Sequence, residues 1–260
     1  MAGNTLYIEK DSSLHRLHPL TKLSVTLFCL ICAFTLPDLL WLLAVYLVIL
    51  LPPAALGGLL RPFLKSCVTV MTPFVISLTL IQGFFTGGET ILLEVGRFAF
   101  TAEGALAGLT AAARILLALG GALLLMLSTR PDRLMLAFTQ RGLPNSLAYI
   151  VLTALQIFPS FQKRAQVILE AQQARGLETK VGVVGRMRLL LPLTGPLVLS
   201  SIVDVEARAM ALEARAFSRP GRKTSLQVLY DSRGQRIMRF GLIVLSLGLI
   251  AARMWLIFYD

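Results

Sequence analysis

The chain has 260 residues, of which 56% are hydrophobic and only 15% are charged, and its mean hydropathy is +0.74. Soluble proteins are nearer a quarter charged, so a large part of this chain must lie in lipid. The formal net charge of +11 is concentrated in residues 130–239, which hold 17 Lys and Arg against 7 Asp and Glu. This distribution disfavours a secreted disulfide scaffold, a disordered chain and a free nucleic-acid-binding domain.

The first candidate membrane span is the uncharged run 23–37, which is short of the ~20 residues that a crossing needs. Cys29 and Cys32 form a C-x-x-C pair inside this run. We interpret them as packing residues rather than a metal or redox site, because no second pair follows. His15 and His18 precede the run, and we assign them to a loop that enters the membrane rather than to a metal site.

Four longer runs complete the set of candidate spans, at residues 39–60, 66–88, 104–129 and 240–259. The run 104–129 contains Arg114. A charge in lipid is costly and is often functional, so Arg114 is a candidate for an intramembrane contact. The alternative is that its long side chain reaches the membrane surface.

Basic residues orient these spans, because cytoplasmic loops are enriched in Lys and Arg. They gather before the first span, between the second and third, and after the fourth, which predicts a cytoplasmic N-terminus and a return to the cytoplasm at residue 130. Two further uncharged runs, 142–162 and 189–203, are interpreted as cytoplasmic helices. If both crossed the membrane, the basic segment between them would lie outside.

The predicted fold is therefore an all-α polytopic membrane protein with about five transmembrane helices and a helical cytoplasmic domain. Residues 1–129 form an N-terminal membrane domain of about four transmembrane helices, residues 130–239 the cytoplasmic domain and residues 240–260 the C-terminal transmembrane helix. Proline and glycine positions divide the cytoplasmic domain into a short helix after Arg130 and two long ones. The second long helix is expected to be interrupted at Pro192 and Pro196.

Both long helices end on the same short pattern, 40 residues apart. The first ends Ala174-Arg175-Gly176, and the second ends Ala214-Arg215-Ala216. One interpretation is that each arginine only complements the helix dipole. The other is that small neighbours leave the guanidinium free to bind a carboxylate or to cap carbonyls on a partner. Because a helix rises ~1.5 Å per residue, two such ends are far enough apart to serve two grooves.

No motif for energy chemistry or catalysis is present. The sequence has no G-x-x-x-x-G-K-[ST], no H-E-x-x-H and no G-x-S-x-G, and it has only two histidines. We therefore predict a chain that is not an enzyme, with no catalytic residue, metal ligand or cofactor of its own. A membrane protein with a basic helical platform and no such chemistry is expected to borrow energy from a partner.

Five segments of the sequence carry a resemblance to a known family: residues 14–23, 128–132, 141–144, 170–176 and 213–215. Over nearly its whole length the chain resembles the transmembrane T component of energy-coupling factor transporters, including the Q subunit of cobalt importers. In that family, two Ala-Arg-Gly-type motifs end coupling helices that contact two ABC-type ATPases. The resemblance implies that Ala174, Arg175 and Gly176, with Ala214, Arg215 and Ala216, are the ATPase-coupling residues.

The resemblance also implies the partners and the location. A membrane-embedded S component would capture a vitamin or a transition-metal ion, and Arg114 is a possible contact for it. ATP and Mg would be bound by the partner ATPases, with no nucleic acid involved, and the complex would lie in the cell (inner) membrane of a bacterium or archaeon. Ala216 replaces the common Gly and resists a positive φ, so a left-handed cap is not expected there.

Three other functions remain open. The permease of a conventional ABC importer has an E-A-A-x-x-x-G coupling loop, which residues 170–176 mimic, but one loop leaves Ala214 and Arg215 unexplained. A membrane-embedded enzyme is disfavoured by the lack of a convergent metal or nucleophile set. Contact of the basic stretch with nucleic acid or anionic lipid is the generic use of such charge.

Overall fold

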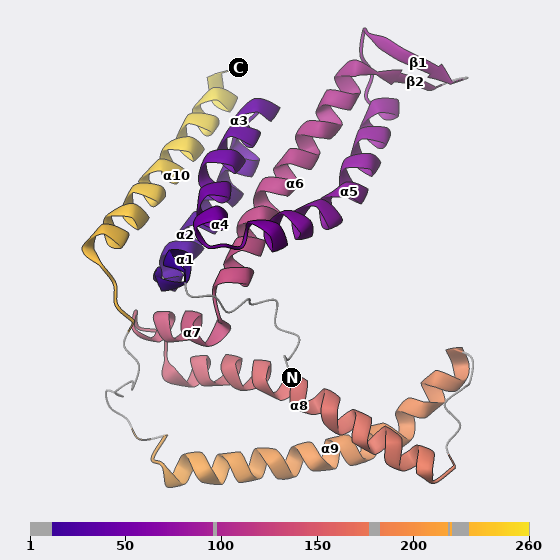
Figure 1. Ribbon diagram of the computed structural model, residues 1–260, viewed down its shortest axis with the longest axis vertical. Helices are drawn as coiled ribbons and strands as arrows, with labels where there is room; N and C mark the ends of the chain where they lie inside the picture. The colour runs from indigo at the N-terminus through magenta and orange to yellow at the C-terminus, as the bar shows by residue number, and fades with distance from the viewer. Residues whose placement is uncertain (1–11, 96–97, 177–182, 218, 220–228, 260) are drawn as a thin grey trace. The chain divides into compact units, whose positions relative to one another are not determined.

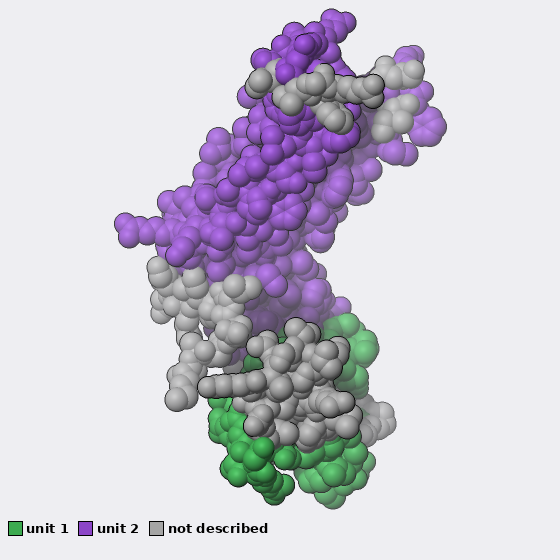
Figure 2. Space-filling view, turned by 90° about the vertical axis from the view of Figure 1, so that its right-hand side faces the viewer, with its two compact units in different colours: residues 1–4, 142–228 green, residues 5–141, 229–260 purple. Residues whose placement is uncertain are grey.

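The computed structural model describes residues 12–95, 98–176, 183–217, 219 and 229–259. The chain divides into two compact units (Figure 2). We call residues 5–141 with 229–260 the membrane unit, and residues 142–228 with 1–4 the coupling unit. The coupling unit begins at Gly142, because the short helix before it packs against α2 of the membrane unit.

The membrane unit is built from helices α1 to α7, which follow one another along the chain, and from α10, which returns after the coupling unit (Figure 1). Among the residues that the structure describes, four stretches are long and apolar enough to cross a membrane, and α2 is a shorter apolar helix. The protein is therefore a multi-pass membrane protein with an all-α architecture, as the sequence predicted. Its helices are α1 (Ser13–Arg16), α2 (Pro19–Thr35), α3 (Leu39–Val45), the π-helical turn η1 (Tyr46–Leu50), α4 (Leu51–Leu56), α5 (Leu60–Phe85), α6 (Ala102–Ser128), α7 (Pro131–Thr139) and α10 (Arg233–Tyr259).

Two of the spanning helices begin earlier than the uncharged runs predicted. Helix α5 begins at Leu60 rather than residue 66, so Arg61 and Lys65 lie in its first turns and not in a connection. Helix α10 begins at Arg233 rather than residue 240. Lys and Arg are good helix formers and their long side chains reach the membrane surface. A basic residue therefore ends a hydropathy run without ending the helix.

Glycines on α6 allow its close approach to α5. A Cβ atom at Gly108 would lie 2.6 Å from the Cα of Thr79, and one at Gly104 would lie 2.4 Å from the carbonyl oxygen of Gln82. Small residues four apart allow such backbone contact between membrane helices. On another side of α6, a Cβ at Gly121 would lie 3.3 Å from that of the buried Cys29 in α2. Cys29 and its neighbour Cys32 are core packing residues.

A small β-hairpin connects α5 and α6 and was not predicted. Its strands are β1 (Ile91–Val95) and β2 (Phe98–Thr101), and they pair antiparallel. The ring of Phe100 packs edge-to-face on Phe84 at a centroid distance of 5.2 Å, in space left by the absence of a side chain at Gly83. Aromatic and β-branched residues favour strands. Strands of four and five residues are too short for their alternation of side chains to be recognised in the sequence.

The coupling unit contains two long helices, α8 (Asn145–Ala174) and α9 (Val183–Ala214). Helix α8 continues through Pro159. Helix α9 runs as one helix from Val183 to Ala214, so it does not end at Pro192 or Pro196, but it bends sharply within its first half (Figure 1). Proline removes one backbone donor and clashes with the preceding turn, which bends a helix without ending it.

Candidate functional site

The first predicted coupling motif lies at the C-terminus of α8. Ala174 is the last helical residue and Arg175 is the C-cap, with φ −87° and ψ 8°. Gly176 follows with φ +92°, and its N–H donates to the carbonyl of Gln173 at 3.0 Å. This is the left-handed cap that glycine favours. The chain therefore turns away from the helix directly after the arginine.

The second motif forms the same cap at the end of α9, although its third residue is alanine. Ala216 has φ +53°, so the expectation that a left-handed cap would be absent here is wrong. The N–H of Ala216 donates to the carbonyl of Glu213 and that of Phe217 to Leu212, both at 2.9 Å. These two bonds define a Schellman motif, and they offset the cost of a positive φ at a residue with a Cβ.

An aromatic contact supports this second cap. The rings of Phe217 and Tyr149 lie 5.3 Å apart between centroids, which joins the end of α9 to the second turn of α8. A hydrophobic contact made by the residue after the left-handed position commonly accompanies a Schellman motif. Ala216 therefore takes a strained conformation because the hydrogen bonds and the ring contact on either side of it require the turn.

Both arginines point into solvent at equivalent positions. Arg175 and Arg215 are each the residue directly after the last helical alanine, and both are exposed. Neither forms an ion pair with any carboxylate that the structure describes. A guanidinium offers planar donors for a carboxylate or for backbone carbonyls, so each helix ends on an exposed cationic donor group flanked by small residues.

The two helices lie antiparallel, with the arginine ends pointing in opposite directions (Figure 1). Arg164 of α8 pairs with Asp204 of α9 at 2.5 Å, and Tyr149 contacts Phe217 nearer the beginning of α8. In this register Arg215 lies opposite about residue 152 of α8. At ~1.5 Å per residue along α8, the two arginine ends are roughly 35 Å apart.

The ion pair stands at the same distance from both ends. Arg175 follows Arg164 by 11 residues, and Arg215 follows Asp204 by 11 residues. Arg164 and Asp204 are thus separated by the same 40 residues as the two motifs. The sequence analysis did not identify this pair, because contacts between antiparallel helices depend on the packing register and not on an offset along the chain. The coupling unit therefore has two arms of about 16 Å that extend from one polar contact.

Large apolar side chains remain exposed on both helices of the coupling unit. Exposed apolar side chains that adjoin one another mark a site of contact with a protein or a membrane. The most exposed of these side chains include Ile150, Phe158 and Val167 on α8 and Leu199, Val203 and Met210 on α9.

Arg114, the predicted intramembrane candidate, contacts carbonyls at the end of α2. Its Nη2 atom lies 3.5 Å from the carbonyl oxygen of Leu36 and 3.4 Å from that of Pro37. Helix α2 is short, so its final carbonyls lie beside the middle turns of α6 and need donors there. The structure thus gives Arg114 a partner within its own chain, and its contact with another subunit stays a prediction.

A partly buried polar cluster in the membrane unit was missed by the sequence analysis. Asp231 accepts hydrogen bonds from Arg239 and Arg141. Arg239, only 7% exposed, lies 3.3 Å from the Nδ1 atom of His18. Burial lowers the pKa of His18; Asp231 opposes this, and the two arginines add to it. The pKa of Asp231 is also lowered, because the arginine hydrogen bonds and nearby positive charge outweigh its desolvation.

Comparison with known proteins extends over both units. The family model of CbiQ, described as "Cobalt transport protein", matches residues 10–226. An "Energy-coupling factor transporter transmembrane protein EcfT" of Heliobacterium modesticaldum is 31% identical, covering 87% of this chain and 88% of the relative. Proteins of the same name from Thermosediminibacter oceani and Listeria innocua are 27% and 29% identical, over 95% and 92% of this chain and 96% and 94% of their own lengths.

Proposed function

The chain belongs to the CbiQ family of transmembrane components of energy-coupling factor transporters, and on this premise we propose that it couples two ABC-type ATPases to a substrate-binding membrane subunit. One observation carries the proposal. Two exposed arginines, Arg175 and Arg215, end helices α8 and α9 in the same cap geometry and at opposite ends of one antiparallel pair. We propose that each arginine-bearing helix end binds one ATPase subunit.

The flanking residues make each arginine accessible. Ala174 and Gly176 on one end, and Ala214 and Ala216 on the other, are exposed and add little bulk beside the guanidinium. A partner's backbone or carboxylate is able to approach the arginine closely, and a charge-assisted contact of this type is stronger than a neutral hydrogen bond. The separation of roughly 35 Å along α8 allows the two ends to occupy two separate subunits.

Movement of the two ends is the proposed basis of coupling. When the ATPases bind ATP, with Mg as its usual ion, and close on each other, both arms of the coupling unit are displaced. The contact of Arg164 with Asp204 lies midway and keeps the two helices in register. The exposed apolar faces of α8 and α9 transmit the displacement to the S component, which holds a vitamin or a transition-metal ion.

The proposed setting is the inner membrane of a bacterial or archaeal cell, with the N-terminus in the cytoplasm. The support is the placement of basic residues at one end of the spanning helices, including Arg61 at the start of α5 and Arg130 after α6. Cytoplasmic ends of membrane helices are enriched in such residues. This orientation puts the coupling unit on the side where ATP is available.

Charge reversal of the two arginines tests the proposal. In the reconstituted complex, Arg175→Glu and Arg215→Glu should each lower ATP-driven uptake by at least about tenfold, because loss of a desolvated charge contact costs several kcal/mol at an interface. The measurements are substrate uptake into vesicles, ATPase activity and co-purification of the ATPases. The control is Lys163→Glu, which reverses an exposed charge in the middle of α8 and should leave all three unchanged.

The same variants separate this function from that of a conventional importer permease. A single E-A-A-type loop at residues 170–176 would make Arg175→Glu inactive and leave Arg215→Glu normal. The coupling proposal requires that both variants lose transport. Normal assembly and uptake by both would exclude it.

A further inference from the structure

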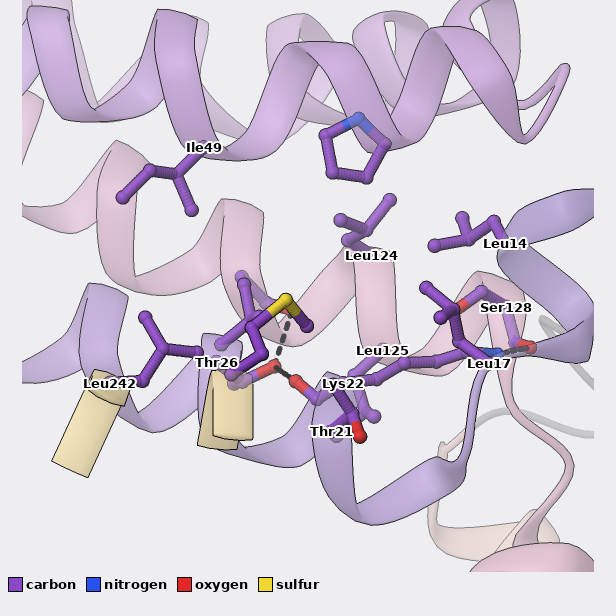
Figure 3. A pocket seen from close by; sticks show the side chains of 14 residues that line it. Leu14, Leu17, Thr21, Lys22, Thr26, Ile49, Leu124, Leu125, Ser128 and Leu242 are labelled. Atoms are coloured by element: carbon purple, nitrogen blue, oxygen red, sulfur yellow. Dashed lines mark hydrogen bonds between the residues drawn. The ribbon is translucent and has the colours of Figure 1, made fainter. Parts of the chain in front are cut away.

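An apolar cavity of about 280 Å³ lies inside the membrane unit, among the first turns of α2, the end of α6, η1, α4 and α10 (Figure 3). Ile49 and Leu242 line one end, and Leu14 and Leu17 line the other (Figure 3). Lys22 runs along the wall and donates from its Nζ atom to the carbonyl oxygen of Ser128 at 2.8 Å. The cavity is thus apolar over most of its length and cationic at one end.

A second, smaller pocket of about 100 Å³ adjoins the cationic end. It shares Leu17, Lys22 and Ser128 with the apolar cavity, so the two meet at the lysine. Its lining, among the described residues, contains no carboxylate and includes three cationic side chains, Lys22, Arg130 and Arg133. Arg130 also pairs with Asp132 at 3.1 Å, so the cations without a carboxylate partner among the described residues are Lys22 and Arg133. A pocket with this composition attracts an anion.

Donors within the pocket are left over for a ligand. Lys22 is 8% exposed and uses one of its three ammonium hydrogens on Ser128. The described residues place no carboxylate in an ion pair with it, and the positive charge of Arg133 lies nearby. The Nδ1 atom of His18 accepts from the N–H of Leu20 and from Arg239, so the ring proton lies on Nε2.

Neutralising the C-terminus of α6 explains only part of this arrangement. A cation at a helix C-terminus is stabilised by the dipole, and the bond from Lys22 to Ser128 is a contact of this kind. It accounts for neither the second cation, Arg133, nor the adjoining apolar cavity. Two cations held together without a counter-ion repel each other, and a bound anion between them would remove that cost.

We propose that this composite site binds one anionic phospholipid, with its phosphate in the basic pocket and one acyl chain in the apolar cavity. The position fits such a ligand, because the site lies where α2 begins and α6 ends, at the level of the lipid head groups for helices that span the membrane. Inorganic phosphate would leave the apolar cavity unused, and a neutral lipid would leave the cations unpaired. The site stands on the membrane unit alone and does not depend on the coupling proposal.

Native mass spectrometry of the purified full-length protein tests the head-group half of the site. Titration with dioleoyl phosphatidylglycerol should give one lipid bound at least about fivefold more tightly than dioleoyl phosphatidylcholine. Arg133→Gln, at an exposed position of the pocket, should remove most of this preference. Arg61→Gln is the matched control, since Arg61 is an exposed arginine at the start of another spanning helix. An equal loss in both variants would indicate general surface attraction and overturn the proposal.

The acyl-chain half is tested with lipid length and a cavity-filling variant. Dihexanoyl phosphatidylglycerol should bind the unaltered protein more weakly than the dioleoyl lipid does. Val25→Phe should weaken binding of the dioleoyl lipid and leave binding of the dihexanoyl lipid unchanged. The comparison of the two chain lengths needs no variant, so it remains valid even if a thermal melt shows that Val25→Phe is unstable. Full displacement of the lipid by inorganic phosphate, or equal binding of both chain lengths, would leave only a free-anion site and overturn the lipid assignment.

Discussion

At the scale of single residues, the two arginine ends share a geometry although their sequences differ at one position. Gly176 takes its positive φ at little cost, whereas Ala216 takes it at roughly 1 kcal/mol. The bond from the N–H of Phe217 to Leu212 and the ring contact with Tyr149 hold the alanine there. The contacts around Ala216 therefore decide its conformation.

Replacement of this alanine by glycine is expected to stabilise the protein. Ala216→Gly relieves the left-handed strain and should raise the free energy of unfolding by about 0.5 to 1 kcal/mol, despite the greater freedom of glycine in the unfolded chain. The matched control, Ala214→Gly, places glycine in the last helical turn and should destabilise by about 1 kcal/mol. Thermal unfolding followed by circular dichroism measures both. Equal destabilisation by the two variants would contradict the strained cap.

At the scale of elements, close helix contact depends on where glycine lies. Helix α6 approaches α5 closely at Gly104 and Gly108, where a side chain would meet backbone atoms of the other helix. Helix α10 also contains Gly248, but a Cβ there would meet no atom within 4 Å. The same residue type is therefore a packing requirement in one spanning helix and replaceable in another.

A pair of glycine-to-alanine variants tests this difference. Gly108→Ala would put a Cβ 2.6 Å from the Cα of Thr79 and should destabilise the membrane unit by about 1–3 kcal/mol. Gly248→Ala should be neutral or slightly stabilising, because alanine is the better helix former. The yield of monodisperse protein and its melting temperature in detergent are the measurements. Tolerance of alanine at both positions would show that α5 and α6 can move apart freely.

At the scale of the whole molecule, a polar cluster joins distant parts of the membrane unit. His18 precedes α2, Arg141 follows α7, and Asp231 and Arg239 belong to the last segment of the chain. These contacts hold the C-terminal helix against the beginning of the bundle, where α10 packs on α2. Charge state at this cluster therefore affects the stability of the whole unit.

Acidification should destabilise the membrane unit through this cluster. The pKa of His18 in the folded protein lies below its ordinary value of 6.5, so the unfolded chain takes up the proton first and stability falls as the pH drops below about 6.5. The contribution of Asp231, whose pKa is lowered from 3.8, is lost only in stronger acid. Melting temperature measured from about pH 8 to pH 5 should fall, and His18→Asn should remove that fall. An unchanged pH profile in the variant would contradict this assignment.

The sequence by itself determined the properties that depend on local composition. Apolar runs gave the spanning helices, and the two Ala-Arg patterns marked the ends of α8 and α9, because hydropathy and helix termination are set by neighbouring residues. Helix starts were less predictable, as at Arg61 and Arg233, since a charge is compatible with a helix that extends beyond the lipid.

Only the tertiary structure decided the features that join residues far apart in the chain. The antiparallel register set by Arg164 and Asp204, and the left-handed Ala216 next to Phe217, follow from packing between α8 and α9. The basic pocket likewise brings Lys22 together with Arg133 at the end of the apolar cavity. Such contacts depend on how helices pack, and helix periodicity alone does not specify which residue of one helix meets which residue of another.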